Sequence, residues 1–246
     1  EIISRSSWTA GFTLVAEQLS KNRVFLAGDA AHLFTPTGGL GYNTAIEDAA
    51  NLGWKLAAVV NGWGGTDLLD SYHRERFPSA VRNTTYARGF AESLGTFKAD
   101  PMLESNTLEG AKLRKEAGEY LNRHGREEFN IPGITFGTRY HNSPIIISDG
   151  TDPPPDQPNV YQPTACPGGR APHLWLEHEN EMAVSLYDQF GFEFSLLIFD
   201  GGTEEKTTPV KVAAEVAGFP LSIIKIAGEE ARALYEANFA LIRPDQ

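Results

Sequence analysis

The sequence predicts an α/β protein made of two parts, and three observations support this. An apolar run at residues 23–27 ends at Gly28 and leads through a glycine-rich loop into a long apolar helix. Apolar runs and helical patterns then alternate between residues 194 and 242. The charge is also uneven, because residues 1–172 carry 16 Lys and Arg against 19 Asp and Glu (net −3), whereas residues 173–246 carry 5 against 13 (net −8). We therefore place a first domain at residues 1–148, a linker at 149–172 and a second domain at 173–246.

The first part opens with the run at residues 23–27, which is typical of a buried strand. A loop rich in Gly and Pro follows, and then Thr44 with Glu47 three residues later predicts a capping box that opens a helix. We run this helix to about Val60. Its polar positions Glu47, Asn51 and Lys55 form one narrow stripe among Ala, Ile, Leu, Trp and Val, which predicts a helix that is nearly all buried.

Further elements follow in order. Residues 68–77 predict a second helix, and Pro78 would open or kink a third that reaches about residue 94. A charged stretch at 104–124 predicts another helix, and 145–147 a strand. The linker holds seven prolines in 24 residues, which indicates extended chain that is neither helix nor central strand.

The last part predicts a small α/β layer. Strands are expected at residues 194–199, 221–226 and 239–242, with helices at 208–217 and 229–237 between them.

Composition excludes several classes of function. A net charge of −11 argues against generic binding to nucleic acid or to anionic membranes, both of which need a basic face. No apolar run approaches the roughly 18 residues of a membrane span, and no basic-then-apolar leader is found, so we expect a cytoplasmic protein. The single cysteine, Cys166, excludes an internal disulfide and argues against a cysteine-based metal cluster. Because the chain starts at Glu1 rather than Met, we expect it to be part of something longer.

The segment with chemical content runs from Gly28 to Asn43. Asp29 comes at the carboxyl end of the predicted strand, where α/β proteins bind ligands, and its carboxylate can accept a hydrogen bond from a ligand hydroxyl. Glycines at 38, 39 and 41 let backbone approach a flat ligand, and the helix behind them offers free N–H groups and a partial positive charge. This predicts a site for a polyol and a neutral or anionic ring edge. The alternative is a surface loop with a structural Asp.

The run Gly28-Asp29-Ala30-Ala31-His32, then Pro36-Thr37-Gly38-Gly39-Leu40-Gly41-Tyr42-Asn43, resembles the second flavin-binding motif of the FAD-dependent aromatic hydroxylases of the para-hydroxybenzoate and phenol hydroxylase type. The similarity continues through residues 48–56. Residues 167–173 look like the entry to the C-terminal thioredoxin-like domain of the phenol hydroxylase branch, and 241–245 fit its last strand. The resemblance implies a partial FAD-binding (glutathione-reductase-like) domain followed by a thioredoxin-like α/β domain.

The same resemblance implies roles for individual residues. Asp29, after Gly28, would hydrogen-bond the ribityl chain of FAD, and Pro36 would lie over the reacting end of the flavin as the catalytic position. The flavin ring would be lined by Gly38, Gly39, Leu40 and Gly41. The N–H groups of Tyr42 and Asn43 would reach the N1 and O2 edge of the flavin, although the family more often has Met or Leu where this sequence has Tyr42.

The implied activity is hydroxylation of a phenolic substrate with NAD(P)H and O₂. The family's Gly-x-Gly-x-x-Gly segment for the FAD pyrophosphate is not found in this sequence. We therefore expect the C-terminal portion of a longer enzyme, inactive without its missing N-terminal portion, with a homodimer as a further option. Halogenation or ring oxidation on the same fold is a weaker option. The alternative outside enzymology is a non-catalytic dimerisation or packing module.

Other candidates are weighed against ordinary structural roles. His32 is expected to be structural rather than a catalytic base. Arg74 and Arg76 are expected on a solvated helix face rather than near nicotinamide phosphates. No metal site is expected. Aromatic residues of the last part are expected in its core, namely Trp175, Tyr187, Phe190, Phe192 and Phe194.

Overall fold

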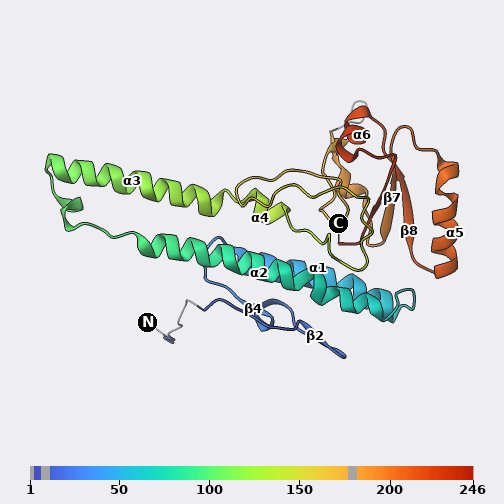
Figure 1. The fold of residues 1–246 in the computed structure, drawn as a ribbon, viewed down its shortest axis with the longest axis horizontal. Helices are drawn as coiled ribbons and strands as arrows, with labels where there is room; N and C mark the ends of the chain where they lie inside the picture. Colours follow the sequence, from blue (N-terminus) through green and yellow to red (C-terminus); the bar gives the residue numbers. More distant parts are fainter. Residues whose placement is uncertain (1–2, 7–11, 177–181, 246) are drawn as a thin grey trace. The chain divides into compact units, whose positions relative to one another are not determined.

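The computed structural model describes residues 3–6, 12–176 and 182–245, which fall into two compact units. We call residues 1–48, 76–135 and 157–160 the helical unit, and residues 49–75, 136–156 and 161–246 the sheet unit. Two long helices, α1 (Leu40–Val60) and α2 (Asp67–Thr96), each contribute one end to each unit (Figure 1).

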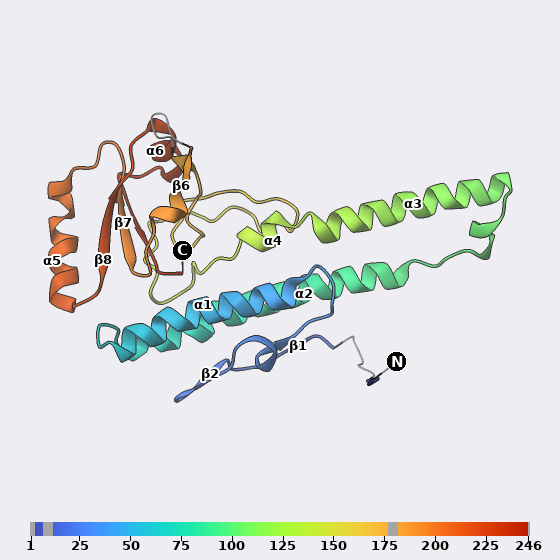
Figure 2. The same cartoon turned by 180° about the vertical axis from the view of Figure 1, so that it is seen from behind.

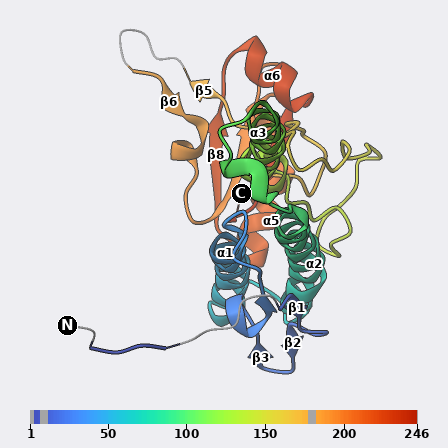
Figure 3. The ribbon, with the colours of Figure 1, turned by 90° about the vertical axis from the view of Figure 1, so that its left-hand side faces the viewer.

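Short antiparallel strands begin the helical unit. β1 (Leu14–Val15) pairs with β4 (His32–Leu33), and β2 (Ser20–Lys21) pairs with β3 (Val24–Phe25); Figure 3 shows β1, β2 and β3 close together. The predicted buried strand at 23–27 is therefore only two residues long, and Val24 is 64% exposed. An apolar run predicts a strand that packs against other apolar residues. It does not tell whether those residues belong to the same 246-residue sequence.

Helix α1 begins at Leu40, four residues before the predicted start. Thr44 lies inside the helix, where its hydroxyl donates to the Leu40 carbonyl at 2.8 Å, so the predicted capping box is wrong. The prediction of a helix that is nearly all buried is also wrong. The buried face of α1 is largely polar, whereas apolar Ile46 and Val60 are 51% and 82% exposed. That buried face consists of Thr44, Asp48, Asn51, Lys55 and Ala58.

The two helices predicted on either side of Pro78 are one helix, α2, of 30 residues. Proline removes one intrahelical hydrogen bond, but the flanking residues Tyr72, Arg76 and Ala80 are all fully buried on one face of the helix. That continuous packing carries the helix through the proline. Helix α3 (Leu108–Phe129) follows the short turn η2 (Pro101–Glu104), confirms the predicted charged helix and runs alongside the second half of α2 (Figures 1 and 2). The short helix α4 (Pro132–Phe136) comes next.

The sheet unit contains the α/β layer, as predicted. Strand β7 (Phe194–Ile198) lies between β8 (Leu221–Lys225), to which it is parallel, and β9 (Phe239–Ile242), to which it is antiparallel. Helix α5 (Thr208–Ala217) connects the parallel pair, and α6 (Glu229–Tyr235) precedes β9. Strands β5 (Trp175–Leu176) and β6 (Val184–Ser185) form a separate antiparallel pair.

The core of the sheet unit is built around Leu197, Phe199 and Tyr235, the last two stacked with ring centroids 4.6 Å apart. Two predicted core aromatics lie outside it, because Trp175 is 62% and Phe192 100% exposed. Tyr187, Phe190 and Phe194 are half-buried.

Two further predictions concern residues 145–147 and the proline-rich stretch at 149–172. Residues 145–147 form a turn and irregular chain rather than the predicted strand. Residues 149–172 contain neither helix nor ladder strand, as predicted, and only isolated bridges such as Gln157 with Val160. Within the described residues, no helix combines the length and the apolar character needed to cross a membrane.

Candidate functional site

The glycine-rich loop of the helical unit takes a conformation that only glycine adopts at little cost. Gly38 and Gly39 are both left-handed, with φ of 66° and 64°, and Gly28 has φ of 59°. Gly39 is exposed, and a Cβ added there would meet no atom within 4 Å, so one side of the backbone is open. Pro36 is exposed beside it. The loop therefore offers bare backbone at the start of α1.

The start of α1 supplies hydrogen-bond donors to the same place. The first N–H groups of a helix have no intrahelical acceptor, and here they belong to Leu40, Gly41 and Tyr42. No acidic residue lies in the first turn to neutralise the partial positive charge of this helix end. The Asn43 side chain donates to the Gly39 carbonyl at 2.8 Å and so ties the turn to the helix.

The side chains of the predicted site residues point in different directions. The Leu40 side chain is buried and packs with Ala87, Ile131 and Ile134, so only its backbone can meet a ligand. Tyr42 is 77% exposed. Asp29 is exposed in the turn η1 (Gly28–Ala30) and takes part in none of the side-chain hydrogen bonds found among the described residues.

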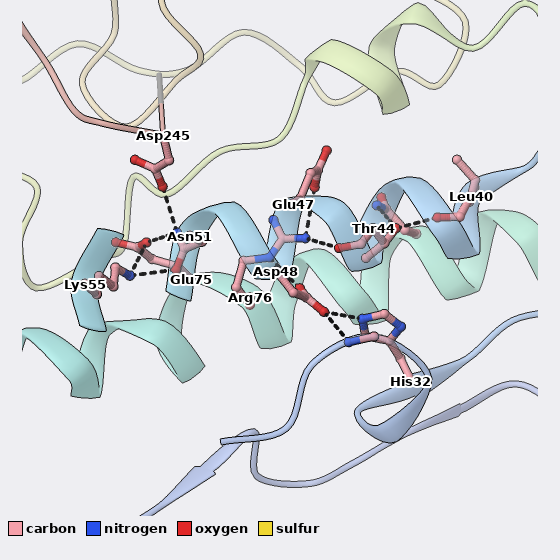
Figure 4. A network of polar contacts seen from close by, with 12 residues as sticks. His32, Leu40, Thr44, Glu47, Asp48, Asn51, Lys55, Glu75, Arg76 and Asp245 are labelled. Carbon is pink, nitrogen blue, oxygen red and sulfur yellow. Dashed lines mark hydrogen bonds and ion pairs between the residues drawn. The ribbon is translucent and has the colours of Figure 1, made fainter. Parts of the chain in front are cut away.

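A buried carboxylate, Asp48, holds the Gly28 end of the loop against α1. Its Oδ2 accepts the Gly28 N–H at 3.1 Å and lies 2.6 Å from His32 Nε2, while its Oδ1 accepts from Arg76 Nε at 2.7 Å. Figure 4 shows the Asp48 carboxylate between His32 and Arg76. Burial alone would raise the pKa of Asp48, but the hydrogen bond from His32 and the charge of Arg76 hold it below its usual range.

Arg76 extends this network along α1. Its Nη2 lies 2.9 Å from Glu47 Oε2 and donates to the Thr44 carbonyl at 3.3 Å. Asn83 Nδ2 donates to the Thr44 hydroxyl at 3.0 Å. Arg76 is fully buried, so both roles considered for it, a solvated face and a nicotinamide contact, are wrong, whereas Arg74 is exposed.

His32 is 1% exposed and forms a hydrogen bond with Asp48, which agrees with the structural role predicted for it. Its Nδ1 has no hydrogen-bond partner in the part of the chain that the structure describes, and its ring is nearly perpendicular to that of Phe34, with centroids 5.2 Å apart. Sequence reasoning missed Asp48 and its buried pairing with Arg76. The spacing of Thr44, Asp48, Asn51 and Lys55 by four, three and four residues is the one signal that could have revealed a single buried face.

The residues present fit one edge of a flavin. Exposed backbone at Gly39 admits a flat ring, the free N–H groups of α1 suit a ring edge that becomes anionic, and exposed Asp29 suits a chain of hydroxyls. Across the described ranges no group of three or more His, Cys, Asp and Glu is placed to hold a metal ion.

Comparisons with known proteins agree with this assignment. The family model described as an FAD binding domain matches residues 1–87. The FAD-dependent monooxygenase apdD of Emericella nidulans is 34% identical over 257 residues, which cover 100% of this chain and 40% of that protein. Phenol 2-monooxygenase of a Pseudomonas species is 33% identical over 277 residues, which cover 100% of this chain and 45% of that protein.

Solved structures are similar along nearly the whole chain. RebC with reduced flavin superposes with a TM-score of 0.82 at 40% identity, covering 94% of this chain and 42% of RebC. The flavin-dependent monooxygenase PieE, in complex with FAD and substrate, gives a TM-score of 0.78 at 30% identity, covering 98% and 46%. The chain thus spans less than half the length of these relatives.

Proposed function

This chain belongs to the FAD-dependent aromatic monooxygenases, of whose members it spans a part, and we propose that it supplies the second flavin-binding segment of an enzyme that hydroxylates a phenolic substrate. The observation that carries the proposal is the open backbone of Gly39, in the left-handed Gly38-Gly39 turn, in front of the free N–H groups of α1. A phenolic substrate is supported by relatives that are named for one, such as phenol 2-monooxygenase.

Each part of the loop has a task in this proposal. Asp29 binds the ribityl hydroxyls, and Pro36 contributes its backbone carbonyl beside the substrate ring. Because α1 begins at Leu40, before its predicted start, its free N–H groups are those of Leu40, Gly41 and Tyr42, and the Asn43 N–H assigned to the flavin from the sequence lies beyond them. We propose that these three groups point at the N1 and O2 edge of the flavin, where negative charge develops on reduction. When bound, FAD supplies the redox chemistry that carries electrons from NAD(P)H to O₂. This chain's residues orient the ring and hold that charge.

The rest of the site must come from outside these 246 residues. The adenosine and pyrophosphate of FAD need a Gly-x-Gly-x-x-Gly turn, which this sequence does not contain. We propose that an N-terminal portion of the same enzyme supplies it and covers the exposed apolar face of α1, including Ile46 and Val60. Without that portion the chain should bind FAD weakly and be inactive.

For the sheet unit we propose a thioredoxin-like domain without thiol chemistry. In support, β7, α5 and β8 form a parallel β-α-β unit, and β9 adds an antiparallel strand. The only cysteine, Cys166, lies outside this layer, and the sequence has no second cysteine to make a Cys-x-x-Cys pair. A cytoplasmic location, where NAD(P)H is available, and a homodimer complete the proposal.

A flavin titration separates this proposal from a non-catalytic packing module. FAD fluorescence is followed as the 246-residue chain is added, for the wild type, for Asp29→Ala and for Glu119→Ala, an exposed carboxylate on α3 that serves as the charge-matched control. We expect quenching by the wild type and by Glu119→Ala, and about tenfold weaker binding by Asp29→Ala, the loss of one or two hydroxyl contacts to a charged group. If neither the wild type nor Asp29→Ala changes the fluorescence, autonomous binding of FAD is excluded. For the longer enzyme, absence of flavin and of O₂ consumption with NAD(P)H and phenols would exclude the monooxygenase.

A further inference from the structure

The Gly38-Gly39 turn is held by a residue 90 positions away in the sequence. The Gly38 N–H donates to Oε1 of Glu128 on α3 at 2.9 Å. The preceding residue, Thr37, donates its hydroxyl to the Ala87 carbonyl of α2 at 2.6 Å. All of these residues lie in the helical unit, so the turn is fixed within that unit by both neighbouring helices.

Glu128 is itself fixed by His124, one turn earlier on the same helix. His124 Nε2 lies 2.8 Å from Glu128 Oε2, and the two side chains are only 9% and 10% exposed. On its other side, His124 Nδ1 lies 3.3 Å from the Ser93 hydroxyl of α2. The two oxygens of Glu128 are thus divided between a turn and an orienting histidine, which leaves the carboxylate one direction in which to point.

This contact falls where the backbone has most freedom. Two consecutive glycines in the left-handed region have many other conformations available, so their geometry must be imposed from outside. An ionised carboxylate forms a stronger and more directional hydrogen bond with a backbone N–H than a neutral acceptor does. Gly39 accepts a hydrogen bond from the Asn43 side chain of α1, whereas Gly38 donates to Glu128 of α3. The second bond therefore ties the turn to an element outside the loop and α1.

We propose that Glu128, oriented by His124, is a positioning residue for the flavin-binding loop. It fixes the Gly38-Gly39 turn so that the open face of Gly39 and the N–H groups at the start of α1 meet the flavin ring together. This inference rests on the proposed function, because the proposed function is what makes FAD the ligand of this turn. A purely structural role would instead stabilise the packing of α3 on α2 without specific effect on the turn.

Three variants of the 246-residue chain separate these roles. Glu128→Met keeps the length of the side chain but removes the acceptor, Glu128→Gln restores an acceptor of nearly the same shape, and Glu127→Met is the matched control at an exposed neighbouring position. Hydrogen exchange of the Gly38 amide is measured by NMR, beside amides in the middle of α1 and in β7. FAD binding is measured by fluorescence titration on the same samples.

We expect Gly38 exchange to become about tenfold faster in Glu128→Met, the effect of losing one hydrogen bond, with little change in α1 or β7. Binding of FAD should weaken by about the same factor. Glu128→Gln should recover most of both losses, and Glu127→Met should match the wild type.

Two outcomes would overturn the inference. One is faster exchange throughout the helical unit in Glu128→Met, with Gly38 no different from the rest, which would make the residue merely structural. The other is unchanged FAD affinity in Glu128→Met despite faster Gly38 exchange. If the wild-type chain itself does not bind FAD, autonomous binding is excluded and the inference fails with it, whereas the proposed function is decided by the flavin content and O₂ consumption of the longer enzyme.

Discussion

Glu75→Gln tests the buried cluster that joins both helices to the C-terminal residues within the sheet unit. The Glu75 side chain is fully buried, and its two oxygens accept from Arg243 Nη1 and Nη2 at 2.9 Å each. Its Oε2 also accepts from Lys55 Nζ at 2.7 Å and from Asn51 Nδ2 at 2.6 Å. Figure 4 shows Lys55 and Asn51 converging on Glu75, with Asp245 reaching Asn51 from the C-terminal segment.

The magnitude follows from the charges. Two cations, Lys55 and Arg243, face two anions, Glu75 and Asp245, so the wild-type cluster is neutral. Glu75→Gln leaves one net positive charge among side chains that are at most 12% exposed. Removing one partner of a buried ion pair costs about 3–5 kcal/mol in the free energy of unfolding.

The pKa of Glu75 gives a similar figure. Burial acts to raise this pKa, but the hydrogen bonds and charge of Arg243, with the charge of Lys55, lower it from 4.5 to about 2. At 1.36 kcal/mol per unit this corresponds to about 3 kcal/mol. Because the folded pKa lies below the unfolded one, this stability is present above pH 4.5 and is lost as the pH falls towards 2.

Folding disfavours the charged form of Lys55, whereas it favours the charged form of Glu75. Burial lowers the pKa of Lys55 from 10.5 to about 8, only partly offset by Glu75. Stability from this group therefore rises as the pH increases from 8 to 10.5. In Glu75→Gln the attraction to Glu75 is gone, Lys55 deprotonates more readily, and we expect the loss of stability to shrink as the pH rises from about 6 to about 8.

The assay is urea unfolding at pH 6 and pH 8, followed by tryptophan fluorescence. Trp54 reports on the cluster directly, because the Arg243 guanidinium lies 5.2 Å from its ring centroid. The control is Glu204→Gln, whose ion pairs with Lys211 and Lys225 lie on the surface of the same unit, where solvent screening keeps their contribution to stability small. A loss below about 1 kcal/mol for Glu75→Gln at pH 6, no larger than the control, would refute the reasoning.

Three further predictions concern the loop. Asp48→Asn leaves the buried Arg76 without its carboxylate partner and should cost about 3–5 kcal/mol in urea unfolding, unless the network contributes no more than a surface pair. In the wild type the pKa of Asp48 is lowered despite burial, so its contribution should be present above about pH 4 and lost on acidification. Thermal melts between about pH 5 and pH 2.5 should therefore show the difference between the wild type and Asp48→Asn shrinking as the pH falls, a comparison in which the loss from Glu75 cancels. Gly39→Ala adds a Cβ in open space at φ of 64°, so backbone strain should lower the free energy of unfolding by about 1 kcal/mol. The free energy of FAD binding should fall by much more, because the Cβ occupies the space proposed for the flavin ring. Equally small losses in unfolding and in binding free energy would argue against a flavin ring packed on this backbone.

The sequence predicted the α/β layer of the sheet unit well because its elements follow local rules. Helix α5 matches its predicted bounds and ends at Gly218, a left-handed cap with φ of 67°. Strand β7 is short, apolar and buried from Ser195 to Ile198, which is what an apolar run predicts for a central strand. These features depend on neighbours in the sequence, and the chain contains what they need.

Predictions for the helical unit failed where long-range partners decide the outcome. Thr44 looked like a cap because Glu47 follows at the right spacing, but Asn83, 39 residues away, draws its hydroxyl into a buried network. Pro78 looked like a break, yet tertiary packing on both sides maintains the helix. Glu128 gave no sign of its contact with Gly38, because a charged helix face carries no information about which carboxylate will be buried.

Helix α1 buries its polar face and exposes its apolar one, and this arrangement links these failures to the site. Its polar face is buried because Asp48 must reach Gly28, and because Arg76 and Glu75 on α2 carry charges that need partners. Hydrophobic packing of the same helix pair would be non-directional and would leave the Gly28 N–H without an acceptor. A carboxylate that accepts from Gly28 at one end of the loop, and another that accepts from Gly38 at its other end, fix a backbone that glycine alone would leave free. The buried charges are therefore the means by which a glycine loop, flexible by composition, is presented to a ligand in one conformation.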